Sequence, residues 1–408
     1  MTHELNSAEN IDLADKILSK YSICNACLGR MFAKIGHDMS NVSRGSILRQ
    51  HLQNHSQPAE NCWLCKGITD EIDHFTDLVI NALKNYEFET FLLGCKIEDD
   101  ILKKEQDIQA SFPTSFPESI KNELNREIGK KLEEKLQKTV DFEDPTIMAI
   151  VDTSYDLVDL QIKSLYLYGR YRKLERGIPQ TKWFCRICRG KGCRRCNYTG
   201  KIYDVSVEEI IAEKILQKTI GTEESFHGCG REDIDVRMLG TGRPFVIEVK
   251  DPKIREMEMS DLMKDINKNG KGKVEVSNLR YSNSVEVARI KSAEFKKIYL
   301  VKIMGEKLIN MEKLKKAART LQGTTISQYT PSRVARRRAN LIRERKIYAC
   351  NVDSVDGSIA TLTIESESGT YIKELVSGDN GNTNPNISEL IGIPCNVKEL
   401  DVMEIKGE

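Results

Sequence analysis

The stretch HGCGREDIDVRMLGTGRPFVIEVKDP, residues 227–252, joins a densely charged loop to an apolar segment. Asp233 and Asp235 stand two positions apart, so on an extended segment both side chains face the same way. Three arginines lie around them: Arg231, Arg237 and Arg243. Arginines lower the pKa of a carboxylate and can bind it in bidentate geometry. The loop is therefore either a structural Arg–Asp network or a carboxylate held as a nucleophile, a base or a metal ligand.

Strand patterns dominate the chain around this loop. Apolar-rich segments are found at 244–250, 295–304, 345–352, 359–368 and 396–406. Helices are expected near 206–220, where Ser206 is a plausible cap, and near 308–321 and 386–392. This series predicts a mixed, mainly antiparallel sheet with flanking helices.

The amino-terminal half predicts a second region of helices and strands. Residues 71–97 have the pattern of a helix followed by a short strand. Apolar residues recur every four positions from Ile120 to Leu136, as on one face of an amphipathic helix. Residues 146–173 alternate apolar and polar side chains, as half-buried strands do. The fold class expected for the whole chain is α+β.

Length and composition exclude several classes of protein. A chain of 408 residues suggests two or three domains, and 39% hydrophobic with 30% charged residues is typical of a globular protein. No apolar run approaches the ~18 residues that a membrane-spanning helix needs. The start, MTHELNSAENIDLADK, lacks the basic region and apolar core of a secretion signal. We therefore expect a cytoplasmic protein that does not enter a membrane.

Eight of the twelve cysteines form four Cys-x-x-Cys pairs, a pattern that favours metal sites over disulfides in a chain without an export signal. The first quartet is Cys24, Cys27, Cys62 and Cys65. The second quartet is Cys185, Cys188, Cys193 and Cys196. Four thiolates make a closed tetrahedral shell, so structural zinc is expected and a catalytic metal is not. The alternative for the first quartet is that four buried thiols are paired by chance. For the second quartet, the sequence leaves open whether the four cysteines bind a metal of their own.

Two stretches concentrate positive charge, although the net charge is only +1. Residues 163–201 hold twelve Lys or Arg against one acidic residue, interleaved with tyrosines and Trp183, and residues 331–346 hold seven against one. Cations neutralise phosphate while rings stack on unpaired bases, so this mixture favours folded RNA. The predicted RNA contacts are Arg170, Arg172, Lys173, Arg333, Arg336 and Arg337. Solvated faces over core tyrosines are the alternative.

Three segments resemble the motifs of pseudouridine synthases, in the order those enzymes have them. GREDIDVRMLG resembles the catalytic loop, whose core is Gly-Arg-x-Asp with a nucleophilic aspartate, here Asp233. KKIYLVKI resembles the Lys-x-Tyr strand and brings Tyr299, while SGTYIKELV resembles the third motif and brings Tyr371 and Lys373. Together they indicate this superfamily.

Longer segments narrow the resemblance to the archaeal–eukaryotic tRNA pseudouridine synthases that modify the T-loop. These segments are YGRYRKLERGIPQTKW, TPSRVARRRANL and GTYIKELVSGDNGNTNPNISELIG. With the cysteine-rich amino-terminal half, the resemblance covers nearly the whole chain. It implies an isomerase acting on uridine-55 of tRNA, and in archaeal members also on uridine-54, without a small-molecule cofactor. It also implies an amino-terminal region with zinc and a THUMP domain, and we expect a monomer.

The resemblance also implies a role for each residue of the site. Asp233 acts at the ribose or at the base ring, covalently or by removing a ribose proton. Tyr299 stacks on the extruded base and can help deprotonate C5, Tyr371 lines the pocket, and Lys373 pairs with Asp233. Arg231 and the arginines of 331–346 hold the distorted RNA backbone. Asp235 is interpreted as structural, because the motif matches only the first aspartate.

These patterns divide the chain into four expected regions. They are a zinc-binding region at 1–70, a THUMP-like RNA-binding domain at 71–182, a cysteine-rich junction at 183–204 and the catalytic domain at 205–408. Two alternatives remain: a tRNA-binding module or assembly factor without catalysis, and another THUMP-containing tRNA-modifying enzyme. A methyltransferase would show a glycine-rich cofactor loop and a thiolation enzyme a Ser-Gly-Gly motif, and neither is found.

Overall fold

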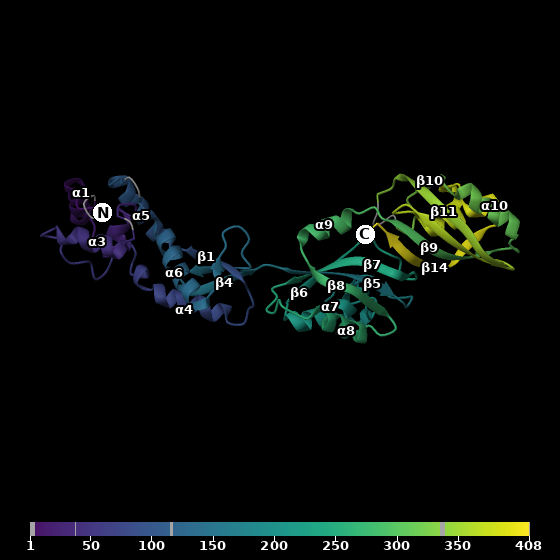
Figure 1. Cartoon of the computed structure of the whole chain (residues 1–408), viewed down its shortest axis with the longest axis horizontal. Coiled ribbons are helices and arrows are strands. Elements are labelled where there is room, and N and C mark those ends of the chain that lie inside the picture. Colours follow the sequence, from purple (N-terminus) through teal and green to yellow (C-terminus); the bar gives the residue numbers. More distant parts are fainter. Residues whose placement is uncertain (1–4, 37, 115–116, 335–338, 408) are drawn as a thin grey trace. The chain divides into compact units, whose positions relative to one another are not determined.

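The computed structural model describes residues 5–36, 38–114, 117–334 and 339–407. It consists of two compact units, Met1–Lys163 and Ser164–Glu408 (Figure 1). Within the described ranges no helix combines the length and the apolar character that crossing a bilayer requires.

The first unit packs helices on a small sheet. Its helices are α1 (Ala8–Lys20), α2 (Asn25–Arg30), α3 (Asn41–Gln50), α4 (Ile72–Leu83), α5 (Asp99–Ser111) and α6 (Ile120–Leu136), with the short 3-10 turn η1 (Ile68–Asp70). The sheet is ordered β2 (Thr139–Val140), β1 (Thr90–Lys96), β3 (Ile147–Asp152), β4 (Leu157–Ile162). β1 is parallel to β2 and β3, and β4 is antiparallel to β3.

Helix α6 confirms the amphipathic pattern seen in the sequence. Ile120, Leu124, Ile128 and Leu132 are fully buried and belong to the core of this unit. The helix begins after Ser119, whose hydroxyl accepts a hydrogen bond from the Asn122 amide and so satisfies one free N–H of the first turn. The buried face of α6 packs on α4 and β1.

The second unit is built on one large sheet. Its strands are β5 (Leu165–Lys173), β6 (Glu223–Gly228), β7 (Arg237–Lys250), β8 (Val274–Ser282), β9 (Lys296–Gly305), β10 (Thr325–Tyr329), β11 (Ile342–Asp356), β12 (Ile359–Ser366), β13 (Thr383–Asn384) and β14 (Cys395–Lys406). The order is β13–β10–β11–β12–β9–β14–β7–β5–β8, with β6 paired to β7. β14 and β7 are parallel, and the other pairs are antiparallel. The predicted α+β class with a mixed, mainly antiparallel sheet is confirmed.

Helices cover this sheet and close its core. They are α7 (Val207–Thr219), α8 (Met259–Asn269), α9 (Ser284–Ser292), α10 (Met311–Leu321), α11 (Ile372–Ser377) and α12 (Ile387–Ile391), with the 3-10 turns η2 (Arg194–Cys196) and η3 (Asp379–Gly381). Figure 1 shows α7 and α8 beside β8, and α10 beside β11. Each of these helices contacts the strand beside it. The predicted helices at 206–220, 308–321 and 386–392 correspond to α7, α10 and α12. Ser206 caps α7 as expected, accepting from the Glu209 amide.

One strand lies in a different unit from the one expected. Leu165–Lys173 fell in the predicted RNA-binding domain, but as β5 it pairs with β7 and β8 in the large sheet. Both neighbours of β5 are strands of the second unit, and helices cover the sheet there, so β5 is buried along most of its length. The structure therefore places this strand in the second unit.

Candidate active site

The charged loop connects β6 to β7, two antiparallel neighbours in the large sheet. Gly230 has a φ of 75°, in the left-handed region where a side chain is strained. A Cβ at this position would also lie 3.2 Å from Arg243 Nη1 and 3.4 Å from Lys297 Nζ. Glycine thus lets the loop turn tightly over two cationic side chains.

A cavity of about 480 Å³ opens beside the loop. Asp233, Tyr299, Tyr371 and Lys373, the residues of the three predicted motifs, all line it. Its remaining walls come from the loop, from β7, β9, β11 and β14, from residues that follow β10 and from the segment that joins β12 to α11: Gly230, Arg231, Glu232, Val236, Arg243, Lys297, Arg333, Val334, Arg343, Arg345, Ser368, Gly369, Thr370, Ile372, Leu400 and Val402. Segments more than a hundred residues apart in the sequence therefore meet at one site.

Asp233 lies between two cations. Arg333 Nη1 donates to Asp233 Oδ2 at 2.6 Å, and Lys373 Nζ lies 3.4 Å from the same oxygen. The other side of the guanidinium of Arg333 is held by the buried carboxylate of Glu374, at 2.6 and 3.0 Å. Burial acts to lower the pKa of Arg333, but Glu374 and Asp233 outweigh it and the pKa is raised. The side chain of Asp233 is 40% exposed, so it remains accessible from the cavity.

Lys373 is closer to the second aspartate than to the first. Its ammonium donates to both oxygens of Asp235, at 2.9 and 2.7 Å. Desolvation acts to raise the pKa of Asp235, but the hydrogen bonds from Lys373 prevail and the pKa is lowered. Asp235 itself is 67% exposed and is not among the residues that line the cavity.

Two tyrosines form part of the cavity wall. Tyr299 is buried, and burial raises the pKa of its phenol to about 12, with Arg243 opposing the rise and Asp233 adding to it. The backbone of Tyr371 is fixed by Gln328, which accepts from the Tyr371 amide and donates to its carbonyl, both at 2.9 Å. The Arg333 guanidinium lies 5.9 Å from the centre of the Tyr371 ring.

The three arginines of the loop have three different surroundings. Arg237 binds Asp401 through Nε and Nη2, at 3.0 and 2.6 Å. Arg243 pairs with Glu232 at 2.8 Å, and the Arg231 guanidinium lies 5.6 Å from the centre of the Trp183 ring. The expectation that Arg237 and Arg243 hold an aspartate of the loop is wrong, because other carboxylates are closer to them in the fold.

The residues predicted to contact RNA have different surroundings in the structure. Arg170 and Lys173 are buried, and their side chains donate to backbone carbonyls of the second unit. This does not fit a phosphate contact, which needs a charged group at the surface. Arg172 is half exposed and pairs with Glu275, and Arg333 lies in the cavity. Arg336 and Arg337 fall outside the described residues.

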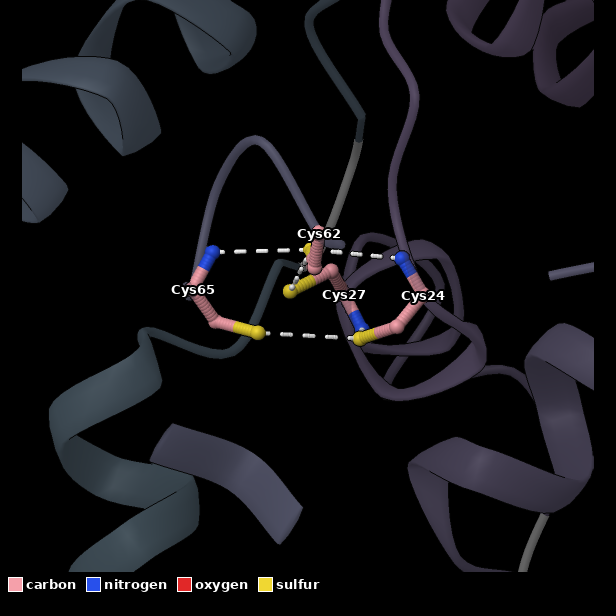
Figure 2. A group of neighbouring side chains, drawn as sticks. All are labelled: Cys24, Cys27, Cys62 and Cys65. Carbon is pink, nitrogen blue, oxygen red and sulfur yellow. Dashed lines mark hydrogen bonds between the residues drawn. The ribbon is translucent and has the colours of Figure 1, made fainter. Parts of the chain in front are cut away.

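The first cysteine quartet is formed by two short segments of the chain, each of which contributes two cysteines. Cys24 caps α2 and Cys27 lies in its first turn, while Cys62 and Cys65 precede η1. Figure 2 shows the four side chains turned toward one another. The Sγ atoms of Cys24 and Cys65 are 3.7 Å apart, and those of Cys27 and Cys62 are 3.5 Å apart.

The second quartet has similar spacing in a more open place. Its Sγ atoms are separated by 3.9 Å (Cys185 to Cys193), 3.8 Å (Cys188 to Cys196) and 3.7 Å (Cys193 to Cys196). None of the twelve cysteines forms a disulfide. Four sulfurs at ~2.3 Å from a tetrahedral zinc would be ~3.8 Å apart, so both quartets have the spacing of a metal shell. Each set could therefore hold one metal ion, and all four thiolates of the set would be used.

Several residues of the site were missed in the sequence. Lys297 stands two positions before Tyr299 on β9, inside the recognised Lys-x-Tyr motif, so the motif could have indicated it. Arg343 and Arg345 alternate on β11 and share one face, but only the pairing of β11 shows that this face lines the cavity. Glu232 gave no signal, because a glutamate in a charged loop is usually exposed.

Two family models match the chain. The family model described as "Pus10, C-terminal" matches residues 166–406, and that described as "Pus10 THUMP domain, archaeal" matches residues 75–152. The predicted THUMP-containing amino-terminal region and carboxyl-terminal synthase domain are thereby confirmed.

Curated relatives match nearly the whole chain. The tRNA pseudouridine synthase Pus10 of Methanocaldococcus jannaschii is 41% identical over 96% of this chain and 93% of its own length. The proteins of the same name from Halorubrum lacusprofundi and Pyrococcus furiosus are 39% and 37% identical and cover 98% and 97% of this chain and 96% and 97% of their own lengths. A chain of a solved Cbf5-Nop10-Gar1 complex covers 58% of this chain and 48% of its own length at 15% identity, with a TM-score of 0.33, too low to bear on the fold. Matches of this length and identity confirm the resemblance, and the chain belongs to the Pus10 family of tRNA pseudouridine synthases.

Proposed function

We propose that this chain isomerises uridine to pseudouridine in the T-loop of tRNA, at uridine-55 and also at uridine-54, with Asp233 as the catalytic carboxylate. The observation that carries the proposal is the convergence of Asp233, Tyr299, Tyr371 and Lys373 on one cavity. Its volume of about 480 Å³ lies within the roughly 300–1,000 Å³ usual for small-ligand sites.

The reaction needs a positioned carboxylate and an enclosed ring. The N1–C1′ bond breaks, the uracil turns, C5 bonds to C1′ and loses its proton, and N1 takes up a proton. The atoms of substrate and product are therefore the same, and no other reactant is consumed. Asp233 contacts Arg333 and Lys373 and lines the cavity, where it can act on the ribose or on the base. Both chemical roles of the aspartate are compatible with this placement.

Tyr299 suits stacking better than proton abstraction. Burial raises the pKa of Tyr299 to about 12, so its phenol stays protonated at neutral pH and is a poor base. The ring forms part of the cavity wall, where an extruded uracil can lie against it. Stacking on Tyr299 would help to offset the few kcal/mol that extrusion of a base costs.

The cations around the cavity suit the RNA backbone. Arg343, Arg345 and Lys297 line it together with Arg333 and Lys373. Neutralising phosphates on both sides of the extruded nucleotide would hold the strand while the base turns. Arg231, which also lines the cavity, is proposed to take part in the same backbone contact.

We further propose that the metal of the quartets is structural zinc. The donor set is thiolate alone, which favours zinc over magnesium or calcium, and four protein ligands leave no open position for substrate. The metal would fix the fold around it, and the steps at the uridine would rest on the protein side chains of the cavity.

The proposal is tested with an unmodified tRNA transcript and the purified full-length protein. Replacing Asp233 by Asn should lower the single-turnover rate by roughly 10³-fold or more, with tRNA affinity kept within a small factor. Asp235→Asn, two residues away, is the matched control and should retain turnover. Sequencing-based mapping of pseudouridine, with transcripts carrying cytidine at position 54 or 55, reports which uridine reacts. An active Asp233→Asn variant would refute the assignment, and a wild-type protein that binds tRNA without forming pseudouridine would favour a binding module.

A further inference from the structure

Glu232 stands beside the catalytic aspartate but is far more buried. Its side chain is only 1% exposed, whereas that of Asp233 is 40% exposed. A buried carboxylate is costly unless it is paired, so its partners should show what it does. Those partners are Arg243, Tyr171 and Lys173, all within the second unit.

The three partners bind Glu232 from two strands. Arg243, on β7, brings its Nε to 2.8 Å from the carboxylate, although the N–H is not aimed at it, so the contact is ionic. The Tyr171 hydroxyl, on β5, lies 2.9 Å from both oxygens. Lys173 Nζ, also on β5, is 3.8 Å away. Glu232 thus accepts a hydrogen bond from Tyr171 and is the counter-charge of two buried cations.

Two of these partners, Lys173 and Arg243, also hold the backbone of the catalytic loop. Lys173 is fully buried, and its ammonium donates to the carbonyls of Asp233, Ile234 and Ile178 at 3.1, 3.2 and 2.9 Å. Arg243 Nη1 donates to the Cys229 carbonyl at 2.7 Å. The loop between β6 and β7 has few backbone hydrogen bonds of its own, so these side chains fix its path on both sides of Glu232.

Gln180 completes the arrangement from a further segment. Its amide nitrogen donates to the Gly230 carbonyl at 3.0 Å and to the Tyr171 hydroxyl at 2.8 Å. Four carbonyls of the segment from Cys229 to Ile234 are therefore bound by side chains that contact Glu232 directly or through Tyr171.

We propose that Glu232 is a positioning residue: by binding Lys173, Tyr171 and Arg243 it fixes the catalytic loop so that the Asp233 carboxylate is presented to the substrate. This inference rests on the proposed role of Asp233. Burial lowers the pKa of Lys173 and Glu232 acts to raise it, so the carboxylate helps to keep charged the ammonium that holds the loop. Without Glu232, two buried cations lose their counter-charge and the loop loses its fixed path.

The expected effect is on rate, not on tRNA affinity. Displacement of a reacting group by about 1 Å can cost on the order of 10²-fold in rate. Glu232→Gln in the full-length protein should lower the single-turnover rate at saturating tRNA by roughly 10- to 100-fold, while the dissociation constant stays within about threefold. Tyr171→Phe, which removes one hydroxyl, should show a smaller loss in the same direction.

Two further variants separate positioning from mere stability. Glu123→Gln removes a buried carboxylate that is paired with Arg30. Glu123 belongs to the first unit, whereas the catalytic loop belongs to the second. This variant should lower the melting temperature but leave the rate unchanged at a temperature where the protein is folded. The double variant Glu232→Gln/Lys173→Met removes one of the two uncompensated charges and leaves that of Arg243, so it should recover part of the stability lost in Glu232→Gln while its rate stays low.

The outcomes are distinct. A normal rate for folded Glu232→Gln, or a double variant that recovers rate together with stability, would overturn the inference. If Glu232→Gln does not fold, the double variant and Tyr171→Phe carry the test alone. An active Asp233→Asn variant would instead show that the proposed catalyst is wrong, whatever the result at Glu232.

Discussion

The two cysteine quartets have the same four ligands but different surroundings. In the first, Cys27, Cys62 and Cys65 are buried and belong to the core of the first unit. In the second, Cys185 is buried and the other three are half-buried, and the residues between them are mostly exposed. Five exposed cations surround the second quartet: Arg186, Arg189, Lys191, Arg194 and Arg195. The comparison teaches that a metal shell can be part of a domain core or can shape a surface, depending on what packs around it.

Arg30 explains how the first quartet is joined to its unit. It ends α2, the helix that Cys24 caps, and it is fully buried. Its guanidinium lies 3.3 Å from Glu105 of α5 and 3.6 Å from Glu123 of α6, in ionic contacts without aligned hydrogen bonds. The cysteine turn and the two helices are therefore linked by charge inside the core. The second quartet has exposed arginines in place of such a buried link.

The largest effect should follow loss of a ligand from the first quartet. Cys27→Ser removes a thiolate from a shell whose metal binding contributes directly to folding, by an amount on the order of 10 kcal/mol in small zinc domains. We expect the first unit to unfold at 25 °C and one zinc equivalent to be lost, measured by circular dichroism and elemental analysis.

The control is Cys95→Ser, a buried thiol in β1 outside both quartets. It should cost only about 1–3 kcal/mol, the usual penalty for a poorly paired buried hydroxyl. A Cys27→Ser protein that unfolds like the Cys95→Ser protein would contradict a structural role for the first quartet.

Removing the buried arginine should have the next largest effect. Arg30→Met leaves Glu105 and Glu123 without their counter-charge in the core, which should destabilise the first unit by about 3–5 kcal/mol in urea unfolding. Arg126→Met, which breaks a partly exposed pair with Glu118, should cost no more than about 1 kcal/mol. Equal losses in the two variants would mean that Arg30 does not connect the quartet to the helices.

Loss of a ligand from the second quartet should affect stability less. Cys193→Ser should remove one zinc equivalent and lower the stability of the second unit by at most about 1–2 kcal/mol, because few core residues pack on this segment. If this segment contacts tRNA, affinity should also weaken, by roughly 3- to 10-fold, with the single-turnover rate at saturation unchanged. Unfolding of the second unit in Cys193→Ser would show that both quartets have core roles.

Much of the site could be predicted because its motifs are local. Gly230 to Asp233, Lys297 to Tyr299 and Gly369 to Lys373 are short segments whose residue types and spacing are informative without a fold. The same holds for the cysteine pairs and for the apolar spacing of α6. In each case the information lies within about one turn or one loop.

The parts that were missed depend on tertiary burial. Arg170 and Lys173 lie in a segment of alternating tyrosines and cations that looks like an RNA-binding face, yet β5 is buried between β7 and β8 and both cations bind backbone carbonyls. Arg333 lies a hundred positions from Asp233, so no local pattern could pair them. Sequence charge alone could not distinguish a cation that contacts RNA from a buried cation that stabilises the fold.

That distinction leads to the smallest effect, which concerns binding rather than stability. Arg186, Arg189 and Arg194 are three of the five exposed cations around the second quartet, so they are better placed for phosphate contacts than Arg170 or Lys173. Changing all three to Ala should reduce the slope of log affinity against log salt by about 2 to 3, since each phosphate contact contributes roughly 0.7–0.9. Thermal stability and the single-turnover rate at saturating tRNA should not change. The matched control replaces Lys313, Lys316 and Arg319 on α10, which alters net charge equally on another surface. If both triple variants changed the salt dependence alike, net charge would account for the effect, and the surface around the second quartet would have no contact of its own with tRNA.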